Sequence, residues 1–193
     1  MDERESGLKA RLVDVGVDLV TKEGMQALSL REIARRAGVS HGAPRRYFPT
    51  HLDLLSAIAR QGFAALAARA ATVIADTEVS PRAQILALGR VYLDFARTDR
   101  GMFELMYRHD LLESEQLRLR DTSLPLFGVF VDLVARAQSP SGAEPAFVAG
   151  ALWANLHGIA QLWGWGSLQL ATGTEDVEPL LRATVDAHLG REA

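Results

Sequence analysis

Cysteine is absent from this 193-residue chain, and long apolar runs are absent as well. Without a thiol there can be no disulfide, no thiolate metal site and no cysteine nucleophile. No apolar run reaches the about 20 residues that a bilayer-spanning helix needs, and the charged start Met1-Asp2-Glu3-Arg4-Glu5 does not resemble a signal peptide. We therefore expect a cytoplasmic protein with no membrane partner.

The local signatures of common enzymes are missing too. The chain has no Gly-x-Ser-x-Gly, no His-Glu-x-x-His, no P-loop and no Rossmann glycine pattern. Its five histidines are scattered along the chain, at His41, His51, His109, His157 and His188. Their spacing does not support a metal triad. We expect no catalytic residue, no metal and no cofactor, so an enzyme is the weakest of the alternatives.

Strand signals are nearly absent, and apolar residues recur at the spacing of three and four that is typical of helices. The sequence therefore predicts an all-α protein. Gly24 and Gly38 end two early helices, Ser80-Pro81 and Asp99 begin two later ones, and the turn 139–142 interrupts the pattern. The helices that we expect span 30–37, 52–73, about 145–170 and about 175–189, with further helices before Gly24, after Pro81, after Asp99 and up to Gln138.

The stretch from Ser29 to Phe48 predicts two short helices that meet at one glycine. Ser29 can cap the first helix and form a reciprocal capping box with Glu32. Gly38 supplies the positive φ that ends this helix, and Ser40 can cap the second, with a proline near its first turn. The pattern is that of a helix-turn-helix, so double-stranded DNA is the first partner to consider.

Charge is distributed unevenly along the chain. Five arginines and the single acid Glu32 lie between residues 25 and 51, whereas the chain carries a formal net charge of -3. A basic end on an acidic body suits contact with phosphates. The same pattern also fits a solvated helix pair, or a helical adaptor whose basic patch binds an acidic protein, and a salt-dependent mobility shift would separate these readings.

Several motifs together resemble the TetR family of bacterial transcriptional regulators. They are Ser-Leu-Arg-Glu-Ile-Ala from Ser29, Ala-Gly-Val-Ser from Ala37, Tyr47-Phe48 and Leu54-Leu55. Trp153-Ala154-Asn155-Leu156-His157-Gly158 resembles the signature of the WHG type of C-terminal domain. The resemblance implies about nine helices, with a DNA-binding head at 1–51 and a ligand-binding and dimerisation body at 52–193. It also implies a homodimeric repressor that a small, mostly apolar effector releases from its operator.

The resemblance carries over to particular residues of the head. Arg31 matches a position that can reach a base edge, where an arginine can bind guanine bidentately. Arg45 stands where the family usually has a phosphate-contacting tyrosine, so it can contact either a phosphate or a base. His51 replaces a common lysine and is a weaker phosphate contact near neutral pH. The DNA-binding residues implied are Ser29, Arg31, Ser40, His41, Gly42, Arg45, Arg46, Tyr47 and His51.

In the body, core packing and ligand contact are both open for each aromatic or methionine residue. His157 is the best candidate for a polar ligand anchor, and it can equally be a buried histidine satisfied by its neighbours. The residues placed around the effector are Phe63, Tyr92, Phe95, Met102, Phe103, Met106, Tyr107, Phe127, Phe130, Trp153 and His157. The dimer interface, which the family forms from the last two helices, is expected at Leu156, Ile159, Trp163, Leu181, Val185 and Leu189.

Overall fold

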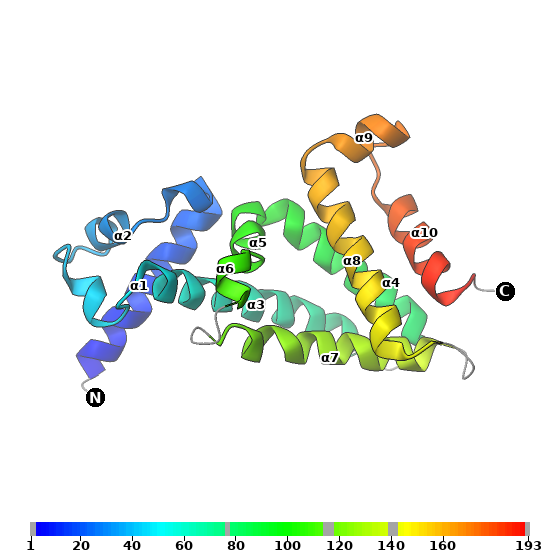
Figure 1. Ribbon diagram of the computed structural model, residues 1–193, viewed down its shortest axis with the longest axis horizontal. Coiled ribbons are helices and arrows are strands. Elements are labelled where there is room, and N and C mark those ends of the chain that lie inside the picture. Colours follow the sequence, from blue (N-terminus) through cyan, green and yellow to red (C-terminus); the bar gives the residue numbers. More distant parts are fainter. Residues whose placement is uncertain (1–2, 76–77, 114–117, 139–142, 192–193) are drawn as a thin grey trace. The chain divides into compact units, whose positions relative to one another are not determined.

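The computed structural model describes residues 3–75, 78–113, 118–138 and 143–191, and every regular element in these ranges is helical (Figure 1). The all-α prediction is confirmed for this part of the chain. The elements are α1 Glu3–Glu23, η1 Met25–Ala27, α2 Leu30–Arg36, η2 Ala43–Arg46, α3 His51–Ile74, α4 Pro81–Thr98, α5 Arg100–Met106, α6 His109–Glu113, α7 Arg120–Ala137, α8 Pro145–Gly164, α9 Ser167–Thr172 and α10 Glu178–Leu189.

The described ranges hold ten α-helices rather than about nine. One reason is that the expected single helix over about 145–170 is wrong. Gly166 adopts φ +77°, a left-handed conformation that a right-handed helix cannot continue through, and it separates α8 from α9. The last helix begins at Glu178 rather than near Glu175. The predicted turn at 139–142 lies outside the described residues.

Two of the predicted helix boundaries rest on bonds that the structure contains. The N–H of Ala83 donates to Oγ of Ser80 at 3.2 Å, so Ser80 caps α4 and Pro81 takes the first helical position. Gly38 has φ +67° and follows α2 closely, as predicted. Asp99 precedes α5 but makes no side-chain cap bond, and it contributes its backbone carbonyl to the N–H of Phe103.

The chain forms two compact units. The first unit comprises the described residues of 1–65 and 99–123, which include α1, α2, most of α3, α5 and α6. Its core contains Leu12 and Leu19 of α1, Ile33 of α2 and Ile58 of α3, all of them fully buried. Burial of these side chains gives about 1.5 to 3 kcal/mol each. The first short element of the predicted DNA motif, α2, is thereby held against α1.

The second unit comprises the described residues of 66–98 and 124–193. Here α4, α8 and α10 pack on one another, and Figure 1 shows α8 beside α10 in yellow and red. Two ion pairs join α4 to α10, between Arg90 and Glu178 and between Arg82 and Asp186. Because the N-terminal arginine pairs with the C-terminal acid, the two helices run antiparallel.

The boundary between the units does not follow the predicted border at residues 51 and 52. Residues 99–123 belong to the same compact unit as the N-terminal helices, and α3 contributes to both units. The predicted border divides the chain by function, whereas the two units divide it by packing. The functional division stays a prediction. Within the described ranges, no helix combines the length and the hydropathy needed to cross a membrane.

Candidate functional site

The N-terminus of α2 places its charged side chains through a cap. The N–H of Glu32 donates to Oγ of Ser29 at 3.2 Å, so the predicted cap is confirmed. The reciprocal half of the predicted capping box is wrong, because the Glu32 carboxylate bonds to Arg35 and Arg36 instead. Nε and a terminal nitrogen of Arg35 lie 2.8 and 2.6 Å from the two carboxylate oxygens, and Nε of Arg36 lies 2.7 Å from one of them.

These bonds change the ionisation of Glu32 and the availability of two cations. Hydrogen bonds from Arg35 and then Arg36 lower the pKa of Glu32 to about 2, so this carboxylate stays charged at any working pH. Arg36 also reaches Glu23 at the end of α1, at 2.7 Å. Two of the five arginines in this region are therefore already neutralised by carboxylates of the same unit.

The other three arginines of the region, Arg31, Arg45 and Arg46, have a different environment. All three are exposed, and none forms an ion pair or hydrogen bond with another described residue. Ser29, Ser40, His41 and Gly42 are exposed beside them. An exposed cation without a carboxylate partner gives up no ion pair when it contacts a phosphate.

The second helix of the predicted motif is only a 3₁₀ turn, η2. Gly42 precedes it and Pro44 lies near its start, so low helix propensity and a missing N–H both oppose a longer α-helix here. Ser40 does not cap η2 through its side chain, and its carbonyl accepts from the N–H of Ala43 instead. Phe48 is 2% exposed and returns to the core as predicted, whereas Tyr47 is only half-buried.

The start of α3 contains a capping box that we did not predict from the sequence. The N–H of Thr50 donates to a carboxylate oxygen of Asp53 at 2.8 Å, and the N–H of Asp53 donates to the Thr50 hydroxyl at 3.1 Å. Threonine followed by an acid three positions later is the sequence signal for this arrangement. The box fixes the first turn of α3, where exposed His51 lies. Burial, followed by the charge of Arg108, lowers the pKa of His51, so its ring is neutral at pH 7.

The predicted ligand-contact residues fall into two groups, one in each compact unit. In the first unit Phe63, Phe103 and Tyr107 contact one another through their rings, with centroids 5.8 Å apart for Phe63 and Tyr107 and 4.9 Å apart for Phe103 and Tyr107. Met102 and Met106 are buried against α3, where a Cβ on Gly62 would lie 2.6 Å from the Met106 sulfur. These five side chains form one apolar cluster.

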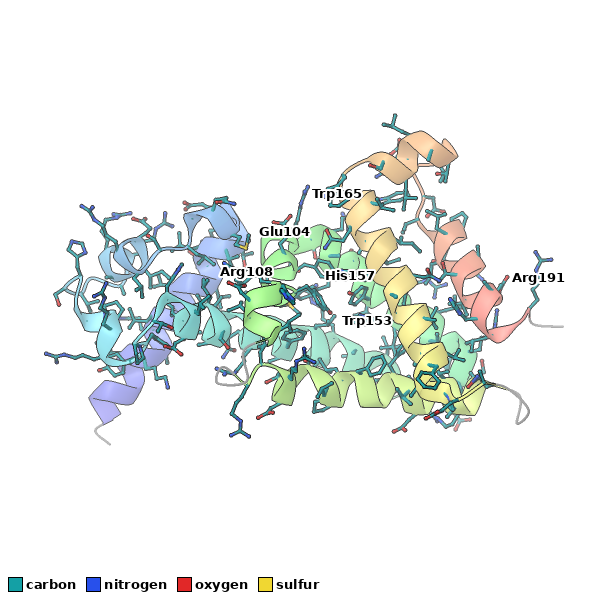
Figure 2. All side chains as sticks on the ribbon, in the orientation of Figure 1. Glu104, Arg108, Trp153, His157, Trp165 and Arg191 are labelled. Carbon is teal, nitrogen blue, oxygen red and sulfur yellow. The ribbon has the colours of Figure 1, made fainter. Side chains whose placement is uncertain are left out.

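In the second unit the cluster contains a polar pair. The Tyr92 hydroxyl lies 2.8 Å from Nδ1 of His157, and Trp153 lies one turn before His157 on α8 (Figure 2). The Trp153 ring centroid is 6.1 Å from that of His157 and 6.0 Å from that of Phe127. Burial lowers the pKa of His157, so it is a neutral hydrogen-bonding group. Phe130 is half-buried, while Phe95 is buried beneath Arg69, with 4.9 Å from the guanidinium carbon to the ring centroid.

Three of the residues assigned to the dimer interface point into the core of their own chain. Leu181 and Val185 are fully buried and Leu156 is 4% exposed. A Cβ on Gly89 of α4 would lie 2.5 Å from Leu181, which shows how closely α10 packs on α4. The interface assignment of these three residues is corrected to core packing. Helical spacing alone could not distinguish the two roles. Ile159, Trp163 and Leu189 are partly exposed, and their assignment stays a prediction.

A different face of α8 is exposed and apolar. Phe147, Leu162 and Trp165 are 73%, 39% and 64% exposed, and Trp165 follows the end of α8 (Figure 2). Ala151, Ala154 and Gly158 lie between them at spacings of three and four, so the six residues share one side of the helix. We call these six residues the α8 stripe. A Cβ on Gly158 would have no atom of a neighbouring described residue within 4 Å.

Comparison with known proteins agrees with these observations. Residues 12–58 match the family model of bacterial regulatory proteins of the tetR family, and residues 85–188 match that of the tetracyclin repressor-like C-terminal domain. The finer WHG type stays a prediction. A curated relative, the HTH-type transcriptional repressor KstR of Rhodococcus jostii (strain RHA1), is 41% identical over 54 residues, which are 28% of this chain and 26% of KstR.

Solved structures match over nearly the whole chain. A protein described as having unknown function, from Rhodococcus sp. RHA1, has a TM-score of 0.76 and 28% identity, covering 94% of this chain and 93% of its own. A TetR-family member from Streptomyces coelicolor A3 has 0.63 and 26%, covering 94% and 98%. The multidrug binding protein EbrR, complexed with imidazole, has 0.65 and 27%, covering 100% and 98%. With one family model matching more than half of its length, the chain belongs to the TetR family of transcriptional regulators.

Proposed function

We propose that this TetR-family regulator is a homodimeric repressor, and that a small, mostly apolar ligand releases it from its operator. The observation that carries the proposal is the separation of two kinds of chemistry between the units. Arg31, Arg45 and Arg46 of the first unit are exposed and have no ion-pair partner among the described residues, and the second unit holds the Tyr92 and His157 pair among aromatic rings. KstR matches 54 residues of this chain, and its name supports repression over activation.

Within the head, we assign base readout to Arg31 and phosphate contact to Arg46. Arg45 can contact either a base or a phosphate. Arg31 is the first charged residue of α2 and has no carboxylate partner in the described part of the chain. Its guanidinium can bind O6 and N7 of guanine with two hydrogen bonds. His41 and Gly42 lie beside η2 and complete the exposed face. Tyr47 and His51 flank this face, with the neutral ring of His51 contributing little to phosphate binding at pH 7.

The ligand assignment rests on the environment of His157. Its Nδ1 is hydrogen-bonded to the Tyr92 hydroxyl at 2.8 Å, and its Nε2 lies 3.5 Å from the Gln161 amide nitrogen. His157 is thus a polar group among aromatic rings. Trp153, which is 39% exposed, and Phe127 supply flat apolar surface next to it. This combination suits a neutral, largely apolar molecule with one polar group. The binding of several drugs by EbrR supports a small molecule of this kind.

The dimer assignment uses the α8 stripe. Its large apolar residues lie exposed in the single chain, and its small residues leave room for a second helix to approach closely. A second copy that covers this stripe would place two heads on one DNA molecule. Pairing of two heads is how helix-turn-helix proteins read half-sites about one helical turn apart, or a multiple of it.

The test begins with an operator selected from random duplexes by the wild-type protein. We expect Arg31→Ala to relax the selected sequence at one position and to lose about 1 to 3 kcal/mol there. The matched control Arg35→Ala should keep the selected sequence. Equal loss on all sequences in the Arg31 variant would remove this residue from base readout.

The ligand arm starts from native mass spectrometry of the purified protein, which identifies a co-purifying molecule. With that molecule, Trp153→Ala and His157→Ala should change the release of operator DNA. Without it, operator affinity should stay within about threefold of wild type, which is less than 1 kcal/mol. If both variants lose DNA binding and become monomers, these two residues are structural and the ligand assignment is wrong.

A further inference from the structure

The one acid of α2 binds two of the three arginines of the helix. Both oxygens of Glu32 accept from Arg35, and one also accepts from Arg36. Arg31 has no such bond with any described residue. The helix therefore carries three guanidinium groups, of which the carboxylate holds two.

Arg35 and Arg36 are not held in the same way. The Arg36 side chain is 30% exposed, and its second carboxylate, Glu23, lies on α1 at 2.7 Å, so Arg36 joins two helices of the head. The Arg35 side chain is 64% exposed, and Glu32 is the only residue to which it is hydrogen-bonded or ion-paired within the described part of the chain. Loss of the Glu32 charge would therefore release Arg35 but leave Arg36 anchored.

The position of Arg35 determines what a released side chain could reach. It lies four residues after Arg31, so the two arginines share one face of α2. In helix-turn-helix proteins the first helix of the motif crosses the DNA backbone. Arg35 lies one turn after Arg31, in the last turn of α2, where a free guanidinium would meet phosphates, which carry no sequence information.

We propose that Glu32 restrains Arg35 and thereby limits the sequence-independent DNA affinity of this head. The inference rests on DNA binding by α2 and on no assignment of effector or operator. Each additional phosphate contact steepens the salt dependence of binding by about 0.9 in a plot of log affinity against log salt. It strengthens binding to every sequence alike, so it reduces the ratio of specific to non-specific affinity. Glu32 is thus a specificity-determining residue that does not contact DNA.

The experiment measures binding to a mixed-sequence duplex of about 30 base pairs by fluorescence anisotropy, from about 50 to 300 mM NaCl. Glu32→Gln keeps the size of the side chain and removes its charge. We expect the magnitude of its salt slope to increase by about 0.9, which is about an eightfold gain in affinity at 0.1 M salt relative to 1 M. Asp14→Asn is the matched control. It removes one exposed negative charge of α1 that forms no ion pair with a described residue, and its slope should equal that of wild type.

Arg35→Ala completes the cycle. Alone it should leave the slope unchanged, and combined with Glu32→Gln it should abolish the gain. The single Arg35 variant tests the proposal even if loss of Glu32 lowers the helicity of α2, which circular dichroism would detect. A slope for Glu32→Gln equal to that of Asp14→Asn overturns the proposal. So does a decrease of about 0.9 in Arg35→Ala alone, because a restrained arginine would then already contact phosphate. Neither result depends on whether a ligand releases the operator.

Discussion

Arg82 and Arg90 of the second unit join distant segments of the chain, whereas Arg35 and Arg36 of the first unit pair with an acid of their own helix. Arg82 and Arg90 of α4 bind Asp186 and Glu178 of α10, which lie 104 and 88 residues further along the chain. In the first unit Glu32 pairs with arginines three and four residues away, and Arg31, Arg45 and Arg46 have no carboxylate partner among the described residues.

The difference teaches how to separate structural from functional cations in this fold. An arginine that is partly buried and bonded to a remote acid contributes to packing, because its removal leaves a carboxylate without its partner. An exposed arginine without a partner contributes almost nothing to folding and keeps its charge for an external anion. Arg35 is intermediate, since it is exposed but held.

The largest expected effect is on DNA binding by the arginines that have no carboxylate partner among the described residues, Arg31, Arg45 and Arg46. Removal of both Arg45 and Arg46 should reduce the magnitude of the salt slope by up to about 1.8, if both contact phosphates. Affinity for any duplex should then be up to about 60-fold lower at 0.1 M salt relative to 1 M. Anisotropy titrations of the double variant against each single variant measure this. A double variant that keeps the wild-type slope would contradict phosphate contact by these two arginines.

The next effect is on stability, through the arginines of α4 that form ion pairs with acids of α10. The Arg82 side chain is 13% exposed and that of Asp186 is 35% exposed, so Arg82→Ala should lower the free energy of unfolding by about 1 to 3 kcal/mol. Urea denaturation measures the change, and the salt slope for DNA should stay that of wild type. Arg46→Ala is the control, with an expected stability change within about 0.5 kcal/mol. Equal stability losses in the two variants would contradict the division.

Much of the local structure could be predicted because it depends on residues within a turn. Ser29 and Ser80 cap the helices expected of them, and Gly38 takes a positive φ beside α2. The predictions that failed involve several groups that compete for one partner, or residues that are far apart in the sequence. Glu32 had three possible donors, the Ser29 N–H and two guanidinium groups, and charged donors bind a carboxylate more strongly than an amide. No local pattern places Asp186 beside Arg82, or turns Leu181 toward Gly89 rather than toward a second chain.

Effects on stability of similar or smaller size are expected at two helical glycines, one in each unit. A Cβ on Gly101 of α5 would lie 2.5 Å from the Val20 carbonyl oxygen, so Gly101→Ala should destabilise the first unit by about 1 to 3 kcal/mol. Gly158 faces open space, so Gly158→Ala in a monomer should stabilise α8 by about 0.5 to 1 kcal/mol. If a second copy packs closely on the α8 stripe, Gly158→Ala should instead weaken the dimer. Sedimentation and thermal unfolding across protein concentrations distinguish the two signs.

The smallest expected effect is the pH dependence contributed by one histidine of each unit. Burial lowers the pKa of His157, and burial followed by the Arg108 charge lowers that of His51, both from an ordinary value of 6.5. As the pH falls, the unfolded chain therefore binds protons at these histidines before the folded chain does. The resulting stability is fully present above about pH 6.5 and is lost as the pH falls through that value toward the folded pKa. Each histidine should therefore contribute to the fall in melting temperature between about pH 7.5 and 5.5. His157→Gln and His51→Gln should each reduce this fall.

Only His51→Gln should also reduce the gain in DNA affinity on acidification, because protonated His51 lies at the head and His157 does not. A loss of that gain in His157→Gln would contradict the separation of DNA contact from the second unit.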